Sequence, residues 1–159
     1  MRLMTRFAGL CKLGWLVLAM TGLLFTGPAA AQNEASRLVL VASSSSPIEA
    51  LAPSEVRRLY LGVPHEVAGR GISPLRFTQA QTQEVFLQKV MFMSLQAYER
   101  QIVSQTFRSG HTRPFETADL SSLTESLLAN PMAVSYLPES DARKAAGLKI
   151  IGDLGRVGS

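Results

Sequence analysis

The sequence predicts a single layered α/β domain that follows a secretory leader. Short apolar runs alternate with segments whose apolar residues recur at helical spacing, and this alternation is typical of strands and helices packed in layers. No internal repeat interrupts the pattern. Residues 32–159 are about one domain in length, which is enough chain to bury a hydrophobic core.

Residues 1–31 have the three parts of a cleavable signal peptide. Three basic residues come first, and an apolar run broken only by Gly and Thr then covers residues 13–26. Ala29 and Ala31 have the small side chains that signal peptidase needs for cleavage before Gln32. The alternative is an uncleaved membrane anchor, but a spanning helix needs about 20 apolar residues, and Pro28 ends this run. We therefore expect cleavage and a periplasmic location.

Removing the leader changes what the composition implies. Three of the 16 basic residues lie in the leader, which leaves 13 basic against 12 acidic residues in the domain. A nearly neutral domain argues against a nucleic-acid partner. The one cysteine, Cys11, also lies in the leader, so the domain has no thiol for a disulfide, a metal site or a nucleophile. We also expect no membrane insertion after cleavage.

The first half of the domain contains a buried strand and a helix with clear end signals. Residues 38–41 (Leu-Val-Leu-Val) form a continuous apolar run, which is typical of a strand buried on both faces. Pro53 and Glu55 favour the start of a helix, and Gly62 is placed to end it. Two more elements follow, a glycine turn at residues 69–71 and a strand at residues 72–77.

The second half is predicted to contain more helix. Apolar spacing predicts helices over residues 78–93 and 94–105, followed by a polar loop over residues 108–114. Asp119 is a favourable N-cap for a helix that ends before Pro131. The remaining predicted elements are a strand at 133–137, a short helix at 141–146 and a last strand at 148–151.

An ordered set of motifs resembles the periplasmic phosphate-binding proteins of ABC transporters, in particular their short, single-domain relatives. The resemblance covers residues 38–151 and implies the fold of one lobe of a type II periplasmic binding protein. In that family, an "I-F-L-G" type motif leads through a glycine turn to a strand ending in Arg, and a Ser-Gly-Thr turn opens the next helix. The matching segments here are Leu59-Tyr60-Leu61-Gly62, Pro74, Arg76, Thr82, Phe86, Phe107 to Gly110, Pro114 and Val134-Ser135-Tyr136.

The resemblance implies a site for phosphate or another small oxyanion. Arg76 would contribute a charge-assisted hydrogen bond, and Thr82 and Gln81 would bind at the start of the following helix, whose free N–H groups attract anions. Ser44 and Ser45 could add hydroxyls, because their turn follows a strand predicted to be parallel, where α/β sheets place ligands. The alternative for the serines is an ordinary flexible turn. The alternative for the other two residues is that Arg76 is a surface or ion-paired residue and that Thr82 is an ordinary helix residue.

Other candidate sites have a simpler interpretation. His65 and His111 lack nearby partners for a metal site and are expected to be exposed in loops. Ser109 precedes Gly110 and His111, but no nucleophile elbow is present, so we expect neither an enzyme nor a cofactor. The Met91-Phe92-Met93 cluster is either a soft filler of the core or an exposed contact surface, and we assign it to the core.

Two functions remain open at this point. One is a substrate-binding protein for a small oxyanion, supported by the spacing of Arg76, Thr82 and Phe86. The other is an interaction or sensor-accessory module that contacts an envelope or ABC transporter protein and has lost the ligand. The second is supported by Ala80-Gln81, which stands where the family has Ser-Gly.

Overall fold

The computed structural model describes residues 37–109 and 114–156, which belong to one structural unit. The predicted signal peptide lies outside these residues. Within the described ranges, no helix combines the length and the apolar character needed to cross a membrane.

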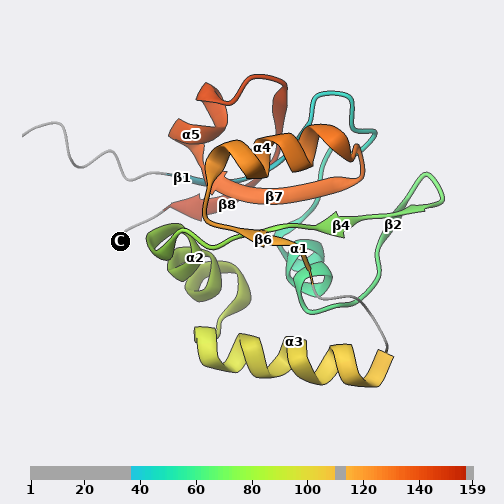
Figure 1. The fold of residues 1–159 in the computed structure, drawn as a ribbon, viewed down its shortest axis with the longest axis vertical. Helices are drawn as coiled ribbons and strands as arrows, with labels where there is room; N and C mark the ends of the chain where they lie inside the picture. The colour runs from blue at the N-terminus through green and yellow to red at the C-terminus, as the bar shows by residue number, and fades with distance from the viewer. Residues whose placement is uncertain (1–36, 110–113, 157–159) are drawn as a thin grey trace, which may run out of the picture. The chain divides into compact units, whose positions relative to one another are not determined.

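The main sheet has mixed strand directions. It consists of β1 (Arg37–Ser43), β4 (Ser73–Pro74), β7 (Ala133–Pro138) and β8 (Leu148–Arg156). The strand order is β4-β7-β1-β8, with β1 antiparallel to β7 and β8 and with β4 parallel to β7 (Figure 1). All of β1 after Arg37 is buried, which confirms the strand predicted from the apolar run at residues 38–41.

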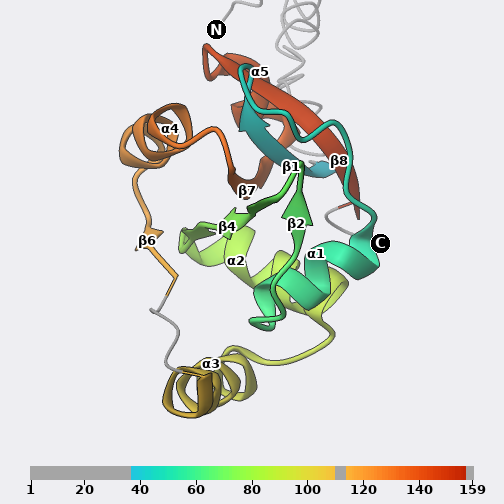
Figure 2. The same ribbon diagram turned by 90° about the vertical axis from the view of Figure 1, so that its right-hand side faces the viewer.

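Helices cover both faces of this sheet. One face carries α4 (Leu120–Ala129) and α5 (Glu139–Lys144), and the other carries α1 (Pro53–Tyr60) and α2 (Ala80–Phe86) (Figures 1 and 2). This arrangement confirms the layered α/β fold. The helix ends also follow the prediction, because Asp119 caps α4 and Gly62 adopts a φ of 83° just after α1. α5 begins two residues earlier than predicted.

The predicted strand over residues 72–77 is divided in the structure. After β4 the chain leaves the main sheet, and β5 (Arg76–Phe77) pairs in parallel with β6 (Glu116–Thr117). β6 was not predicted, because a two-residue strand is too short to show a periodic pattern. Before β4, a hairpin joins β2 (Glu66–Val67) to β3 (Arg70–Gly71).

The predicted helix over residues 78–93 is also interrupted. It consists of α2 and a π-helical turn, η1 (Leu87–Met91), and it ends at Phe92 in the left-handed conformation with a φ of 55°. The next helix, α3 (Leu95–Ser109), is longer than predicted. Met91 is fully buried, as expected, but Phe92 is 71% exposed. The assignment of Phe92 to the core is therefore wrong.

The direction of β1 corrects a second prediction. β1 was expected to be a parallel strand whose carboxyl end leads into the serine turn, but it is antiparallel to both neighbours. β4 runs opposite to β1, so the chain that continues to α2 leaves the sheet at the end far from this turn. In Figure 1 the cyan loop after β1 and the green helix α2 accordingly lie at opposite ends of the sheet.

Candidate functional site

Arg76 is the centre of the candidate site, and two carboxylates of the same chain bind it. Its side chain is only 2% exposed. Nη2 donates to Oε1 of Glu99 at 2.6 Å, and Nη1 donates to Oε2 of Glu116 at 2.7 Å. Glu116 is the residue that pairs with Arg76 across β5 and β6, whereas Glu99 comes from α3. One buried cation therefore joins two strands and a helix.

An aromatic ring completes the surroundings of this guanidinium. The Arg76 Cζ atom lies 4.9 Å from the centre of the Tyr98 ring, within range of a cation–π interaction. Burial by itself would lower the pKa of Arg76. The hydrogen bond that Arg76 donates to Glu99, the neighbouring Tyr98, and the charges of Glu99 and Glu116 outweigh that effect, so the pKa lies above its usual value. The cation is permanent and its charge is balanced internally.

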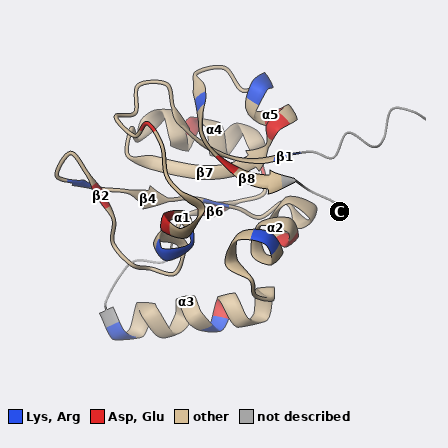
Figure 3. Cartoon of the chain, turned by 180° about the vertical axis from the view of Figure 1, so that it is seen from behind, with Lys and Arg blue, Asp and Glu red and all other residues tan. Residues whose placement is uncertain are grey.

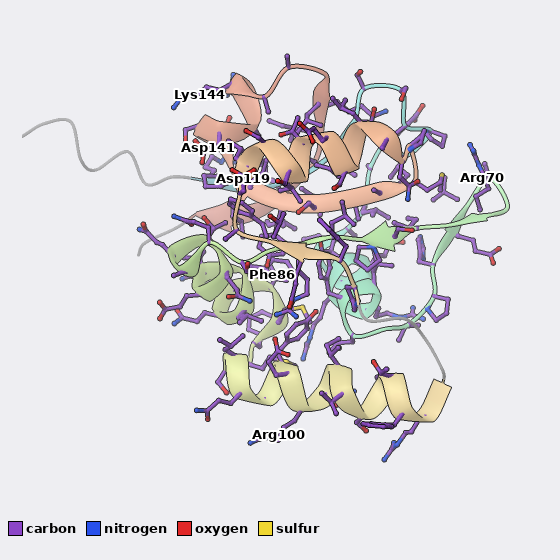
Figure 4. All side chains as sticks on the ribbon, in the orientation of Figure 1. Arg70, Phe86, Arg100, Asp119, Asp141 and Lys144 are labelled. Carbon is purple, nitrogen blue, oxygen red and sulfur yellow. The ribbon has the colours of Figure 1, made fainter. Side chains whose placement is uncertain are left out.

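Three aromatic residues of the motif set pack together beside this cation. The rings of Phe86 and Tyr136 are stacked, with centroids 3.8 Å apart and an interplanar angle of 3°. The rings of Tyr60 and Phe86 make an edge-to-face contact, with centroids 4.8 Å apart. Figure 4 shows Phe86 on α2, next to the strands. The spacing of these motif residues is thus explained by the packing of a core.

The hydroxyls of the motif residues bind backbone carbonyls on either side of Arg76, at Leu75 and Phe77. Tyr60 donates to the carbonyl of Leu75 at 2.8 Å, and Ser135 donates to the same oxygen at 3.1 Å. Tyr136 donates to the carbonyl of Phe77 at 2.9 Å. Burial raises the pKa of both Tyr60 and Tyr136. These hydroxyls hold the strand that carries Arg76 and are engaged within the chain.

The start of α2 is capped by a side chain that was not predicted to do so, that of Gln79. Gln79 Oε1 accepts the backbone N–H of Thr82 at 3.0 Å and also the Thr82 hydroxyl. Thr82 is 5% exposed, and both of its donors are occupied by Gln79. The signal was present in the sequence, because a polar residue three positions before Thr82 has the spacing of an N-cap interaction.

Of the other predicted anion ligands, Gln81 lies beside Thr82, but the two serines lie elsewhere. Gln81 is exposed on α2, and Ser44 and Ser45 are exposed in the turn after β1. The Ser45 hydroxyl is 2.9 Å from that of Ser43, and the Ser44 N–H donates to the carbonyl of Gly147 at 2.8 Å. The structure therefore does not bring the serine turn to the end of the sheet where Thr82 and Gln81 lie.

His65 adds no chemistry to this site. His65 is partly buried, not exposed as expected, and its carbonyl accepts the N–H of Ile72 at 2.8 Å. His111 lies outside the described residues. Within the described ranges, no cluster of three or more His, Cys, Asp or Glu side chains could hold a metal ion.

The two carboxylates could not be found from the sequence. Glu99 and Glu116 are separated from Arg76 by 23 and 40 positions, and no local pattern connects residues so far apart. Their pairing depends on the path of α3 and on the short β5–β6 pair. The arrangement neutralises a buried charge, which is the role a bound anion would otherwise have.

Solved structures confirm the fold. No protein-family model matches the chain, and no curated protein matches it in sequence. Similar structures include an ABC-type phosphate transport receptor from Vibrio cholerae (TM-score 0.53) and one described as "a possible phosphate binding protein" from Planctomyces limnophilus (TM-score 0.50). Both are 13% identical to this chain and match 73% of it.

The matched region covers less than half of either structure. This chain spans 45% of the Vibrio protein and 40% of the Planctomyces protein. The domain therefore has the fold of one lobe of a periplasmic binding protein. The likeness concerns the fold, because the sequence identity is low.

Proposed function

We propose that this chain is an exported module with the fold of one binding-protein lobe, and that it acts by contacting another protein of the cell envelope. On this proposal, residues 1–31 are removed as a signal peptide and residues 32–159 work in the periplasm. The observation that carries the proposal is the pairing of Arg76 with Glu99 and Glu116. Because carboxylates of the chain occupy the guanidinium, the proposed function requires no free oxyanion.

The capping of α2 by Gln79 supports the same proposal. An anion at the start of α2 would need the N–H and hydroxyl of Thr82, and both bind Gln79. Two surface pockets on the described residues, of about 330 and 440 Å³, are lined by residues other than Arg76, Thr82 and Gln81. A protein partner is therefore the better explanation for retaining the fold.

A second candidate is the binding of phosphate or a similar oxyanion by Arg76, Thr82 and Gln81. It is favoured by the similar structures, which are described as a phosphate transport receptor and a possible phosphate-binding protein. Glu99 and Glu116 are 32% and 41% exposed, so both could turn toward solvent if an anion displaced them. Hydroxyls from Ser44 and Ser45 would then have to come from a second molecule or a rearranged loop.

Calorimetry and crosslinking separate the two candidates. For the exported chain recovered from the periplasm, we expect no heat and no melting shift with millimolar phosphate or sulfate. Heat that disappears in Arg76→Met but persists in Arg70→Met would overturn the proposal in favour of anion binding. A photo-crosslinker at exposed positions, for example Phe107, should give one discrete product in the envelope. The lack of such a product at every exposed position would also contradict the proposal.

A further inference from the structure

A surface pocket of about 440 Å³ lies between α1, η1 and β8. Its charged lining is basic, from Arg57, Arg58 and Lys89, and no acidic residue lines it. Its apolar lining includes Leu61, Phe92 and Leu154. The blue segments of α1 and of the turn after α2 in Figure 3 mark the region of these basic residues. The pocket thus combines positive charge with an apolar floor.

Phe92 is held in solvent by an unusual backbone. It is 71% exposed and has a φ of 55°, a conformation that bulky residues rarely adopt. The π-helical turn η1 precedes it, and the Met93 N–H donates to the carbonyl of Leu87 at 3.1 Å, which closes the turn. Strained residues and π-helical turns are frequent at functional sites. The backbone therefore presents an aromatic ring that the core does not use.

Arg57 lies against this ring and retains unused donor capacity. Its Cζ atom is 5.3 Å from the centre of the Phe92 ring. Its Nε atom is buried and has no hydrogen-bond partner among the described residues. A buried donor without a partner is unfavourable, so the described residues do not satisfy every donor of this guanidinium.

We propose that this pocket binds an acidic segment of a partner protein, in which an Asp or Glu carboxylate lies beside an apolar side chain. The inference rests on the proposed function, since it names the surface and the chemistry by which the partner is recognised. A carboxylate matches the planar donor fork of arginine, and the apolar neighbour would pack against Phe92 and Leu154. A bilayer surface fits a concave pocket less well than a peptide side chain does.

The test uses labelled peptides and the exported full domain. The probe is a short fluorescent peptide of alternating glutamate and leucine, and the control peptide has glutamine in place of glutamate. We expect the acidic peptide to bind and the control peptide to bind at least tenfold more weakly. Equal binding of the two peptides, or no binding of the acidic one, would overturn the inference.

Matched variants locate the binding. Arg58→Glu with Lys89→Glu should weaken acidic-peptide binding at least about tenfold, because attraction becomes repulsion at two positions. The control, Arg70→Glu with Arg100→Glu, makes the same change in net charge at the β2–β3 hairpin and on α3 (Figure 4). It should change the affinity less than twofold. Equal losses in both variants would show a general charge effect and contradict the pocket assignment.

Two further measurements separate the alternatives. Phe92→Gly removes the ring at a position where glycine is unstrained, so it should weaken binding without unfolding the domain. Retention of the chain on phosphatidylglycerol vesicles, abolished by Arg58→Glu with Lys89→Glu, would assign the pocket to a membrane surface instead. If the envelope crosslink persists in that double variant, the pocket assignment fails while the proposed function stands.

Discussion

Removing the two carboxylates that bind Arg76 should destabilise the domain and create a site for an anion. The change is Glu99→Gln with Glu116→Gln, which keeps side-chain size and an acceptor oxygen but leaves the buried cation uncompensated. Breaking a fully buried ion pair costs about 3–5 kcal/mol. Because the two glutamates are 32% and 41% exposed, solvent screens part of the interaction, and we expect a loss of about 2 kcal/mol.

The assay is thermal unfolding followed by circular dichroism, with and without phosphate. For a domain of this size, a loss of about 2 kcal/mol lowers Tm by roughly 6–10 °C. Phosphate should restore part of this loss in the double variant, because a ligand at 100 times its Kd stabilises by about 2.7 kcal/mol. The matched control is Glu49→Gln with Glu125→Gln, which removes two exposed carboxylates and should leave Tm nearly unchanged.

Two results would refute this reasoning. If the double variant melts within about 1 °C of the wild-type chain, a change below ~0.5 kcal/mol, Glu99 and Glu116 do not compensate the charge of Arg76. If phosphate stabilises the wild-type chain as much as the double variant, the carboxylates do not occupy an anion site, and direct oxyanion binding is the better explanation.

Three other changes test separate parts of the structure. Phe92→Gly should raise the free energy of unfolding by about 1 kcal/mol, because glycine adopts a positive φ without strain. A urea titration measures this change, and a decrease would show that the exposed ring stabilises the fold. Asp119 has a lowered pKa because the N–H and hydroxyl of Ser122 bind its carboxylate. The ionised carboxylate therefore stabilises the fold above the unfolded pKa of about 3.9, and this stabilisation is lost as pH falls through the lower folded pKa. Asn keeps the cap but has no charge to lose, so the Tm of Asp119→Asn should decrease less between pH 5 and pH 3 than the Tm of the wild-type chain. Scanning calorimetry measures both, and equal decreases would exclude the Asp119 carboxylate as a source of the pH dependence. Burial raises the pKa of Tyr136, so its stabilising contribution is present below about pH 10 and declines at higher pH. Tyr136→Phe should lower the free energy of unfolding by about 1–2 kcal/mol at neutral pH, because the carbonyl of Phe77 loses its donor. Between neutral pH and pH 11, however, the variant should lose less stability than the wild-type chain, as measured by urea titration.

Local signals in the sequence predicted the framework of the fold, and distant contacts determined the rest. The buried strand at residues 38–41 and the cap at Asp119 depend on neighbouring residues, and both predictions are confirmed. The direction of β1 depends on its partners β7 and β8, which lie far along the chain. An isolated run of apolar residues contains no information on that direction.

In the candidate site, too, local spacing identified some residues, whereas contacts between distant residues could not be predicted. Arg76, Thr82 and Phe86 were identified by their spacing, and the structure places all three in its interior. Their partners Glu99 and Glu116 were not predicted, because charged residues usually face solvent. Phe92 was assigned to the core as part of the Met91-Phe92-Met93 cluster, and its exposure accompanies a left-handed backbone at the end of the π-helical turn.

The ion pairs of Arg76 also determine how the domain should open in its native state. They close chain loops of 23 and 40 positions, so α3 and β6 are docked by contacts that are distant in sequence and entropically costly to form. Amide hydrogens of α3 and β6 should therefore exchange together, as one cooperative unit less stable than β1 and β7. This docking would occur late in folding, after the central sheet has formed, and native-state hydrogen exchange would resolve it as a separate subglobal opening.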